Sequence, residues 1–191
     1  NLKVCLYYEQ VPQPGDPRSV LPDLRHILRQ FAKHSAYLKV AGRPVLFVYV
    51  RAIEQLSLPQ WAWVLETVRV EFPPGMCAIG DSLGRSAARV FDGIHTYNPV
   101  GVLEGKPLNA IQPTLETHYR EAVQTAGELG RIACVTIIPA YDDTKIRKPG
   151  IRTDRFGGEA YRKQWEAVLT LNPDWVLITS FNEWHEGSEI E

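Results

Sequence analysis

Residues 175–191, "WVLITSFNEWHEGSEIE", place an apolar run directly before a group of polar and acidic side chains. The run "WVLITSF" has the composition of a buried β-strand. The side chains that follow it include Asn182, Glu183, His185, Glu186, Glu189 and Glu191. A set of this kind occurs either in a solvated loop at a strand end or at the rim of a catalytic site.

Further apolar segments of the same kind recur along the chain. Together with the last one they are 3–9, 44–50, 76–81, 93–99, 133–141 and 175–183. They are nearly continuous in hydrophobicity, which is typical of parallel strands that are covered on both faces. Helical spacing of apolar residues occurs between several of them, in 19–34, 59–72, 113–129 and 157–171. This alternation predicts an α/β fold with a parallel sheet.

The predicted helices have defined apolar faces. In 19–34 the face consists of Leu24, Ile27, Leu28 and Phe31, and in 157–171 of Tyr161, Trp165, Val168 and Leu169. In 59–72 the same spacing selects Trp61, Val64, Leu65 and Val68. Apolar residues at this spacing lie on one face of a helix.

The polar residues at the strand ends favour a barrel over an open doubly wound sheet. An open sheet that binds nucleotides usually has a glycine-rich turn after its first strand, and "YYEQVPQPGDP" contains none. Polar side chains instead end several strands: Glu9, Asp81, Tyr97, Asn98, Tyr141, Asp142, Asn182 and Glu183. A (β/α)8 TIM-type barrel builds its site from the carboxyl ends of several strands. We therefore predict this fold class.

The strand count predicts that the chain covers only part of such a barrel. A complete barrel has eight strands in about 250 residues, whereas this chain has 191 residues. We interpret residues 1–191 as one barrel domain that is truncated at its N-terminus, with strands three to eight present.

Composition narrows the classes of partner. The net charge of -1 argues against a nucleic-acid partner, and no apolar run approaches the ~20 residues of a membrane span. The three cysteines, Cys5, Cys77 and Cys134, lie in apolar segments and match no metal motif, so we expect buried thiols. Five Trp and eight Tyr residues suit either core packing or stacking on sugars.

Four segments together resemble one family. "SAYLKVAGRPVLFVYV", "FDGIHTY", "IIPAYDDTKIR" and "WVLITSFNEWHEGSEIE" are similar to segments of glycoside hydrolase family 99, the endo-α-mannosidases, and of related bacterial domains associated with polysaccharide biosynthesis. The similarity runs along the whole chain in order, and its last segment is the most specific. It implies a (β/α)8 barrel, cleavage of internal α-mannosidic linkages with retention of configuration, and neither a metal nor an organic cofactor.

The resemblance also implies residue roles. Glu183 would take the proton from the 2-hydroxyl of the sugar, which attacks the anomeric carbon and gives a 1,2-anhydro sugar. Glu186 would protonate the departing oxygen and then activate water. Glu9, Tyr97 and Tyr141 would line the sugar subsite, although "YYEQV" around Glu9 departs from the family's "HIEPY".

The residues themselves support paired carboxylates independently of any family. If the chain turns helical after the strand, Glu183 and Glu186 lie on one face, and two close like charges raise one of the two pKa values. Trp184 supplies apolar cover and His185 a hydrogen-bond partner, and Asn182 can hold a sugar hydroxyl or orient a carboxylate. A solvated acidic loop is the alternative. A zinc site of the H-E-x-x-H type is not indicated, because Glu189 stands where its second histidine would fall.

Other polar residues are open to two interpretations. Asp142 and Asp143 can hold sugar hydroxyls with Arg147 pairing a carboxylate, but for Asp143 we favour an Asx turn. His95 is predicted to pack inside its strand. Asp81 either faces the site or caps the short helix that "SLGRSAA" suggests.

Two functions are consistent with these patterns. The first is an endo-acting α-mannosidase-like glycosidase that uses Glu183 and Glu186. The second is a glycan-recognition or polysaccharide-assembly domain that keeps the site without hydrolysis, because a fold does not determine a function. Either takes an oligosaccharide or polysaccharide as its partner.

Overall fold

All six predicted strands are present in the computed structural model, which describes residues 2–190. They are β1 (Leu6–Tyr8), β3 (Arg43–Val48), β4 (Cys77–Asp81), β5 (Gly93–His95), β6 (Ile132–Ile137) and β9 (Trp175–Ile178). Each is shorter than the segment predicted for it, because strand pairing ends before the segment does.

The chain divides into two units. The first holds the residues up to Ile94 together with Leu129–Arg131, and the second holds the other residues from His95 onward. Within residues 2–190, none of the helices combines the length and the hydrophobicity that crossing a membrane requires.

The sheet of the first unit is parallel. Leu6 of β1 lies opposite Leu46 of β3, and Val45 of β3 lies opposite Cys77 of β4. A short strand, β2 (Lys39–Val40), pairs antiparallel with β3. All of β4 and all but the first residue of β3 are buried, as expected for strands that are covered on both faces.

The core of the first unit forms around Trp61 of α3 (Leu58–Glu71). The helix begins with a capping box between Ser57 and Gln60. Trp61 is fully buried, its ring lies 6.0 Å from that of Phe91, and its indole N–H donates to Ala52 in α2 (Val50–Glu54) at 3.2 Å. The predicted apolar face of this helix is therefore largely confirmed.

The predicted face of the first helix is wrong at Phe31. The segment is split into η1 (Pro17–Val20), α1 (Leu21–His26) and the π-helical turn η2 (Ile27–Phe31). The N–H of Ala32 donates to the C=O of Ile27 at 2.9 Å, five residues back. Because a π turn holds more residues than an α turn, Ala32 takes the inward position and Phe31 remains 46% exposed.

Asp81 and the cysteines have surroundings that the fold explains. Asp81 accepts from the N–H of Val50 at 3.2 Å and so contacts the start of α2, and the short helix that "SLGRSAA" predicts is present as α4 (Arg85–Ala88). Cys77 is buried, and burial raises the pKa of its thiol to about 11. Cys134 of the second unit is also buried, whereas Cys5 is half-buried.

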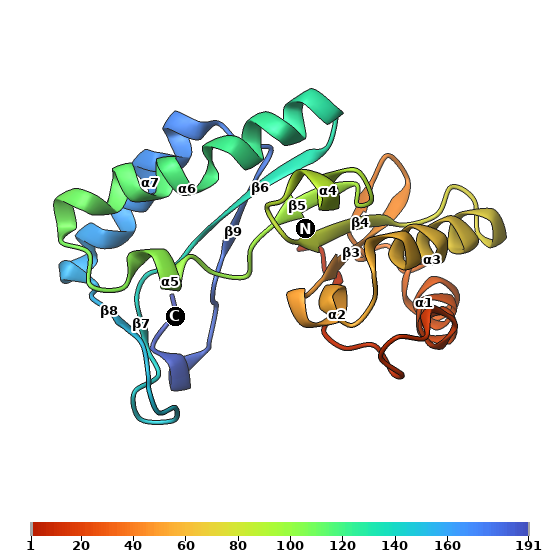
Figure 1. Cartoon of the computed structure of the whole chain (residues 1–191), viewed down its shortest axis with the longest axis horizontal. Coiled ribbons are helices and arrows are strands. Elements are labelled where there is room, and N and C mark those ends of the chain that lie inside the picture. The colour runs from red at the N-terminus through yellow and green to blue at the C-terminus, as the bar shows by residue number, and fades with distance from the viewer. Residues whose placement is uncertain (1, 191) are drawn as a thin grey trace. The chain divides into compact units, whose positions relative to one another are not determined.

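In the second unit, β6 and β9 are parallel neighbours (Figure 1), with Val135 opposite Val176. Two helices are fixed to β6 and its end by side-chain hydrogen bonds. Tyr119 of α6 (Leu108–Leu129) donates to the C=O of Thr136 at 3.0 Å. Gln164 of α7 (Glu159–Leu171) accepts from the N–H of Ile138 at 2.9 Å and donates to its C=O at 2.6 Å.

Shorter elements complete the second unit. They are α5 (Val100–Leu103), the antiparallel pair β7 (Tyr141–Asp142) and β8 (Arg152–Thr153), and the 3-10 turns η3 (Phe156–Gly158) and η4 (Trp184–Glu186). The hairpin of β7 and β8 follows β6, and η4 follows β9.

The buried face of α7 differs from the prediction. Its buried residues are Ala160, Gln164, Ala167 and Val168, whereas Leu169 is 77% exposed. Gln164 can be buried because both ends of its amide are satisfied by Ile138. An apolar pattern cannot reveal a polar residue whose burial depends on a backbone partner.

Gly80 tests the packing of the first unit. A Cβ at this strand position would lie 2.6 Å from the ring of buried Phe91, so we expect Gly80→Ala to lower the free energy of unfolding by about 1–3 kcal/mol. Gly127→Ala in α6 is the control, because no atom lies within 4 Å of its added Cβ, and we expect a gain of about 0.5–1 kcal/mol. Urea denaturation measures both, and an unchanged midpoint for Gly80→Ala would contradict the packing.

Candidate active site

The motif after β9 forms a closed loop over residues 180–190, called the motif loop below. The hydroxyl of Ser180 accepts from the N–H of Glu183 at 2.9 Å, and the N–H of Ser180 donates to the C=O of buried Ser188 at 2.9 Å. The N–H of Ile190 donates back to the C=O of Ser180 at 3.0 Å. These bonds join the two ends of the loop and fix the turn between them.

The two predicted catalytic glutamates flank that turn. Glu183 is the N-cap of η4, and the N–H of Glu186 donates to the C=O of Glu183 at 3.2 Å. Gly187, with φ of 61°, carries the chain out of the turn in a conformation that glycine adopts without strain. The predicted helical turn is confirmed as a single 3-10 turn. Glu183 is exposed, whereas the Glu186 side chain is 13% exposed.

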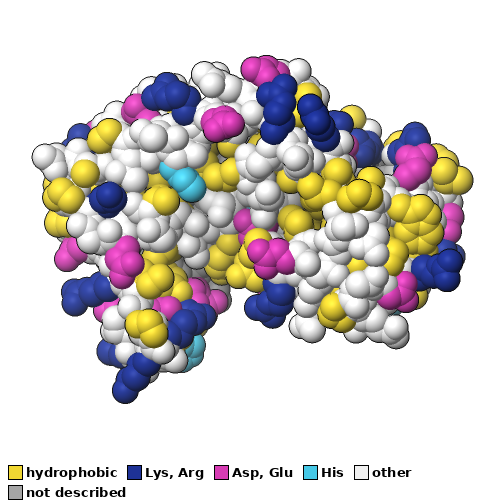
Figure 2. Space-filling view, in the orientation of Figure 1, with side chains coloured by type: hydrophobic (Ala, Val, Ile, Leu, Met, Phe, Trp, Pro, Cys, Tyr) yellow, Lys and Arg dark blue, Asp and Glu magenta, His cyan; other side chains and the backbone are white. Residues whose placement is uncertain are grey.

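Glu186 is held by a cation from the β7–β8 hairpin. Arg147 Nη1 lies 2.7 Å from Glu186 Oε1, and the same nitrogen donates to Asp143 Oδ2 at 2.8 Å and to the hydroxyl of Tyr141 at 2.7 Å. Segment 144–152 carries Lys145, Arg147, Lys148 and Arg152, and Figure 2 shows Lys and Arg side chains gathered over this hairpin. The predicted pairing of Arg147 with a carboxylate is confirmed, with two carboxylates as partners.

Tyr141 and Asp143 form the buried side of this cluster. The Tyr141 hydroxyl donates to Asp143 Oδ2 at 3.1 Å, and Asp143 Oδ1 accepts from the N–H of Ile151 at 2.6 Å. The bond from Arg147, together with that from Ile151, lowers the pKa of Asp143. Burial, and next the charge of Glu186, raise the pKa of Tyr141.

The Asx turn predicted for Asp143 is made by its neighbour. Asp142 Oδ1 accepts from the hydroxyl of Thr144 at 2.6 Å and from its N–H at 3.2 Å, whereas Asp143 is buried. Successive side chains of an extended chain point to opposite sides, so one aspartate meets solvent and the other meets Arg147. The sequence carries no signal for which of the two is buried.

The other predicted site residues of the second unit lie on or beside the loop. Asn182, Trp184 and His185 are exposed on it, Trp184 by 61%. Half-buried Tyr97 lies beside its start, because its C=O accepts from the hydroxyl of Thr179 at 2.6 Å. Glu9 follows β1 in the first unit and is exposed there. His95 is buried as predicted, and burial lowers its pKa to about 4.

Arg155, which the sequence did not single out, fastens the far side of the loop. Its Nη2 donates to the C=O groups of Gly187 and Glu189, each at 3.1 Å, and to Glu189 Oε1 at 2.6 Å. Glu186 is thus followed by a stretch of backbone that is held from outside the loop. A hollow of about 190 Å³ lies beside this contact, lined in part by Arg155, Tyr161 and Ile190.

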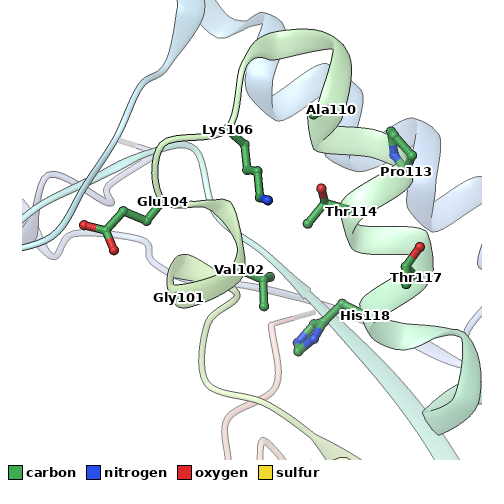
Figure 3. A pocket seen from close by; sticks show the side chains of 9 residues that line it. All are labelled: Gly101, Val102, Glu104, Lys106, Ala110, Pro113, Thr114, Thr117 and His118. Carbon is green, nitrogen blue, oxygen red and sulfur yellow. The ribbon is translucent and has the colours of Figure 1, made fainter.

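A larger cavity lies elsewhere in the second unit. It encloses about 680 Å³ between α5 and the first half of α6, and none of the predicted site residues lines it. Figure 3 shows the Lys106 amino group pointing into the hollow, His118 beside it, and Glu104 pointing away. Burial lowers the pKa of His118. The predicted carboxylate site is therefore separate from this cavity.

Comparison with known proteins gives consistent matches. Residues 84–191 match the model of glycosyl hydrolase family 99. The structure of an endo-alpha-mannosidase of that family from Bacteroides thetaiotaomicron superposes with a TM-score of 0.78 and 27% identity, over 99% of this chain and 56% of that one. The chain is also 26% identical to glycoprotein endo-alpha-1,2-mannosidase of Mus musculus, over all of this chain and 43% of that protein.

A shorter stretch is more similar. Over 55 residues the chain is 47% identical to a human glycoprotein endo-alpha-1,2-mannosidase-like protein, which corresponds to 28% of this chain and 12% of that protein. The chain spans less than half the length of the mouse relative. The superposition confirms the predicted fold class, because the strands and helices correspond to part of a (β/α)8 barrel.

The contacts of Arg155 are expected to stabilise the conformation of the motif loop. Arg155→Met removes the guanidinium nitrogen that donates to Gly187 and Glu189, so we expect several-fold faster amide hydrogen exchange in 184–190. Arg162→Met is the matched control, because the ion pairs that Arg162 forms within residues 2–190 are with Glu159 and Glu166 of its own helix. Equal exchange in this loop for both variants would show that Arg155 does not hold it.

Proposed function

The chain belongs to glycosyl hydrolase family 99, and from this we propose that the protein is a glycosidase that cleaves internal α-mannosidic linkages. Two of the similar proteins are named as an endo-alpha-1,2-mannosidase and an endo-alpha-mannosidase, and these activities support the substrate class. They also make an α-1,2 linkage the first to test.

The observation that carries the proposal is the unequal setting of two carboxylates on one turn. Glycoside cleavage requires one carboxyl group that gives a proton and a second that does not. Glu186 is largely buried and paired with Arg147, whereas Glu183 is exposed and has no ion pair among those found within residues 2–190. Groups of one type in different environments are suited to different roles.

The proposed reaction has two steps and conserves every proton. In the first, Glu183 takes the proton of the sugar 2-hydroxyl, whose oxygen attacks the anomeric carbon while Glu186 protonates the leaving oxygen. A 1,2-anhydro sugar results. In the second, Glu186 takes a proton from water, which attacks the anomeric carbon, and Glu183 returns its proton to the opened 2-oxygen. Two inversions give net retention.

Neighbouring side chains suit a sugar ligand. The exposed Trp184 ring offers a flat apolar surface, and exposed Asn182 and His185 offer hydrogen-bonding groups on the same loop. Tyr97 is proposed as a further sugar contact. The hydroxyl of Tyr141 is bonded to Asp143 and Arg147, so this residue also supports the cation that holds Glu186.

In the test, the purified full-length protein is incubated with α-mannan oligosaccharides. We expect the first-formed product to retain the anomeric configuration of the substrate. Proton NMR of the reaction measures this configuration. Glu183→Gln and Glu186→Gln should each lower turnover by at least about 10²–10⁴-fold, because each removes a proton-transfer group. Circular dichroism of both variants should match that of the unchanged protein.

Glu104→Gln is the matched control, because it makes the same chemical change at an exposed carboxylate outside the motif loop. Full activity in both motif variants would overturn the assignment of the pair. Binding of oligosaccharide in calorimetry with no turnover would overturn the hydrolase and favour a glycan-recognition or polysaccharide-assembly domain.

A further inference from the structure

One nitrogen of Arg147 serves three acceptors. Nη1 lies 2.7 Å from Tyr141 Oη, 2.8 Å from Asp143 Oδ2 and 2.7 Å from Glu186 Oε1. A guanidinium Nη carries two protons, so it cannot make three full hydrogen bonds at once. The hydrogen bonds of this nitrogen go to Tyr141 and Asp143, and Glu186 pairs with it as an ion, so the Glu186 carboxylate competes with these two acceptors for the same donor.

This competition matters for the proposed role of Glu186. A cation 2.7 Å away stabilises the ionised carboxylate, which suits the activation of water. The same cation opposes the protonated form that the first step needs. A second anion beside Arg147 offsets part of that effect, and Asp143 is such an anion at 2.8 Å.

Asp143 is built to remain ionised. It is buried, yet its two oxygens accept from Ile151, Tyr141 and Arg147. Hydrogen bonds to the charged form stabilise it, and the pKa of Asp143 is lowered accordingly. The negative charge of Asp143 beside Arg147 is therefore stabilised by its own hydrogen bonds.

Other charged groups near Glu186 are more exposed or differently engaged. Glu183 and His185 lie exposed on its own loop, and Arg155 binds Glu189 behind it. On the hairpin, Asp142 has Arg152 3.8 Å away, with the Arg152 side chain 69% exposed. Tyr141 carries a hydroxyl whose pKa is raised, so it stays neutral. Arg147 and Asp143 thus set the local charge balance.

We propose that Arg147 and Asp143 are positioning residues that orient Glu186 and set how readily it is protonated, with Asp143 competing for the guanidinium. The inference deepens the proposed glycosidase function and rests on it for its catalytic meaning. When Glu186 holds its proton, Arg147 bonds to Asp143. When Glu186 has given the proton to the leaving oxygen, the same nitrogen donates to the new carboxylate without a large movement.

Two substitutions have opposite expected effects. Arg147→Met removes the cation, so the ionised form of Glu186 loses stabilisation. Asp143→Asn removes the competing anion and keeps an oxygen for Ile151, so Arg147 acts more fully on the ionised form of Glu186. Because Glu186 acts first as an acid, the alkaline limb of kcat/KM should move to higher pH in Arg147→Met and to lower pH in Asp143→Asn.

The titration of Glu186 is measured directly by carbon-13 NMR of the protein labelled at glutamate side-chain carboxyls, with Glu186→Gln to assign the signal. Arg152→Met is the control, because it removes a like charge from the same hairpin without a bond to Glu186. Arg147→Lys keeps the positive charge but lacks the planar guanidinium with its several N–H donors. We therefore expect little shift in the Glu186 titration and a fall in kcat. This variant tests positioning if Asp143→Asn melts below the assay temperature.

The outcomes separate the two proposals. Shifts of opposite sign in the NMR titration support the inference even if no oligosaccharide is cleaved, in which case only the proposed glycosidase function fails. A shift in Arg147→Met no larger than in Arg152→Met, or an upward shift in Asp143→Asn, overturns the inference even in a fully active enzyme. An unchanged kcat in Arg147→Lys would remove the positioning role.

Discussion

The ion pair between Arg147 and Glu186 joins two loops that only the sheet brings together. Arg147 belongs to the hairpin after β6 and Glu186 to the turn after β9, and these two strands are parallel neighbours. Both loops therefore leave from the same edge of the sheet. The Glu186 carboxylate is largely removed from water, and without its partner this buried charge would be unfavourable. The geometry of the whole candidate site depends on the register of one strand pair.

The surrounding contacts keep that register and the two loops in place. Tyr119 and Gln164 fix two helices to β6 and to the residue that follows it. Ser180 and Ser188 close the motif loop with a backbone bond and a hydroxyl contact of 2.9 Å. Arg155 holds the backbone beyond Glu186. Most of these anchors are side chains bonded to backbone groups, which fixes positions more closely than apolar contact alone.

The arrangement produces two carboxylates of different character from two identical side chains. Glu183 faces solvent at the start of the turn, whereas Glu186 lies against Arg147, which it shares with Asp143. The difference arises from what each residue contacts and not from the motif itself. Two carboxyl groups in such different surroundings are suited to different chemical roles.

The sequence by itself determined the alternation of strands and helices, the buried character of β3, β4 and β6, and the turn that carries Glu183 and Glu186. These features follow from local periodicity and spacing, which short-range sterics and burial control. Only the tertiary structure decided that Asp143 and not Asp142 is buried, that Arg147 pairs with Glu186, that Phe31 is exposed after a π turn, and that α7 buries Gln164. Each of these depends on a partner distant in sequence or on one hydrogen bond that shifts the helical phase. The pattern of apolar residues encodes neither the distant partner nor the single hydrogen bond. Such a pattern records which face is buried on average, but it does not show which group a buried polar side chain bonds to.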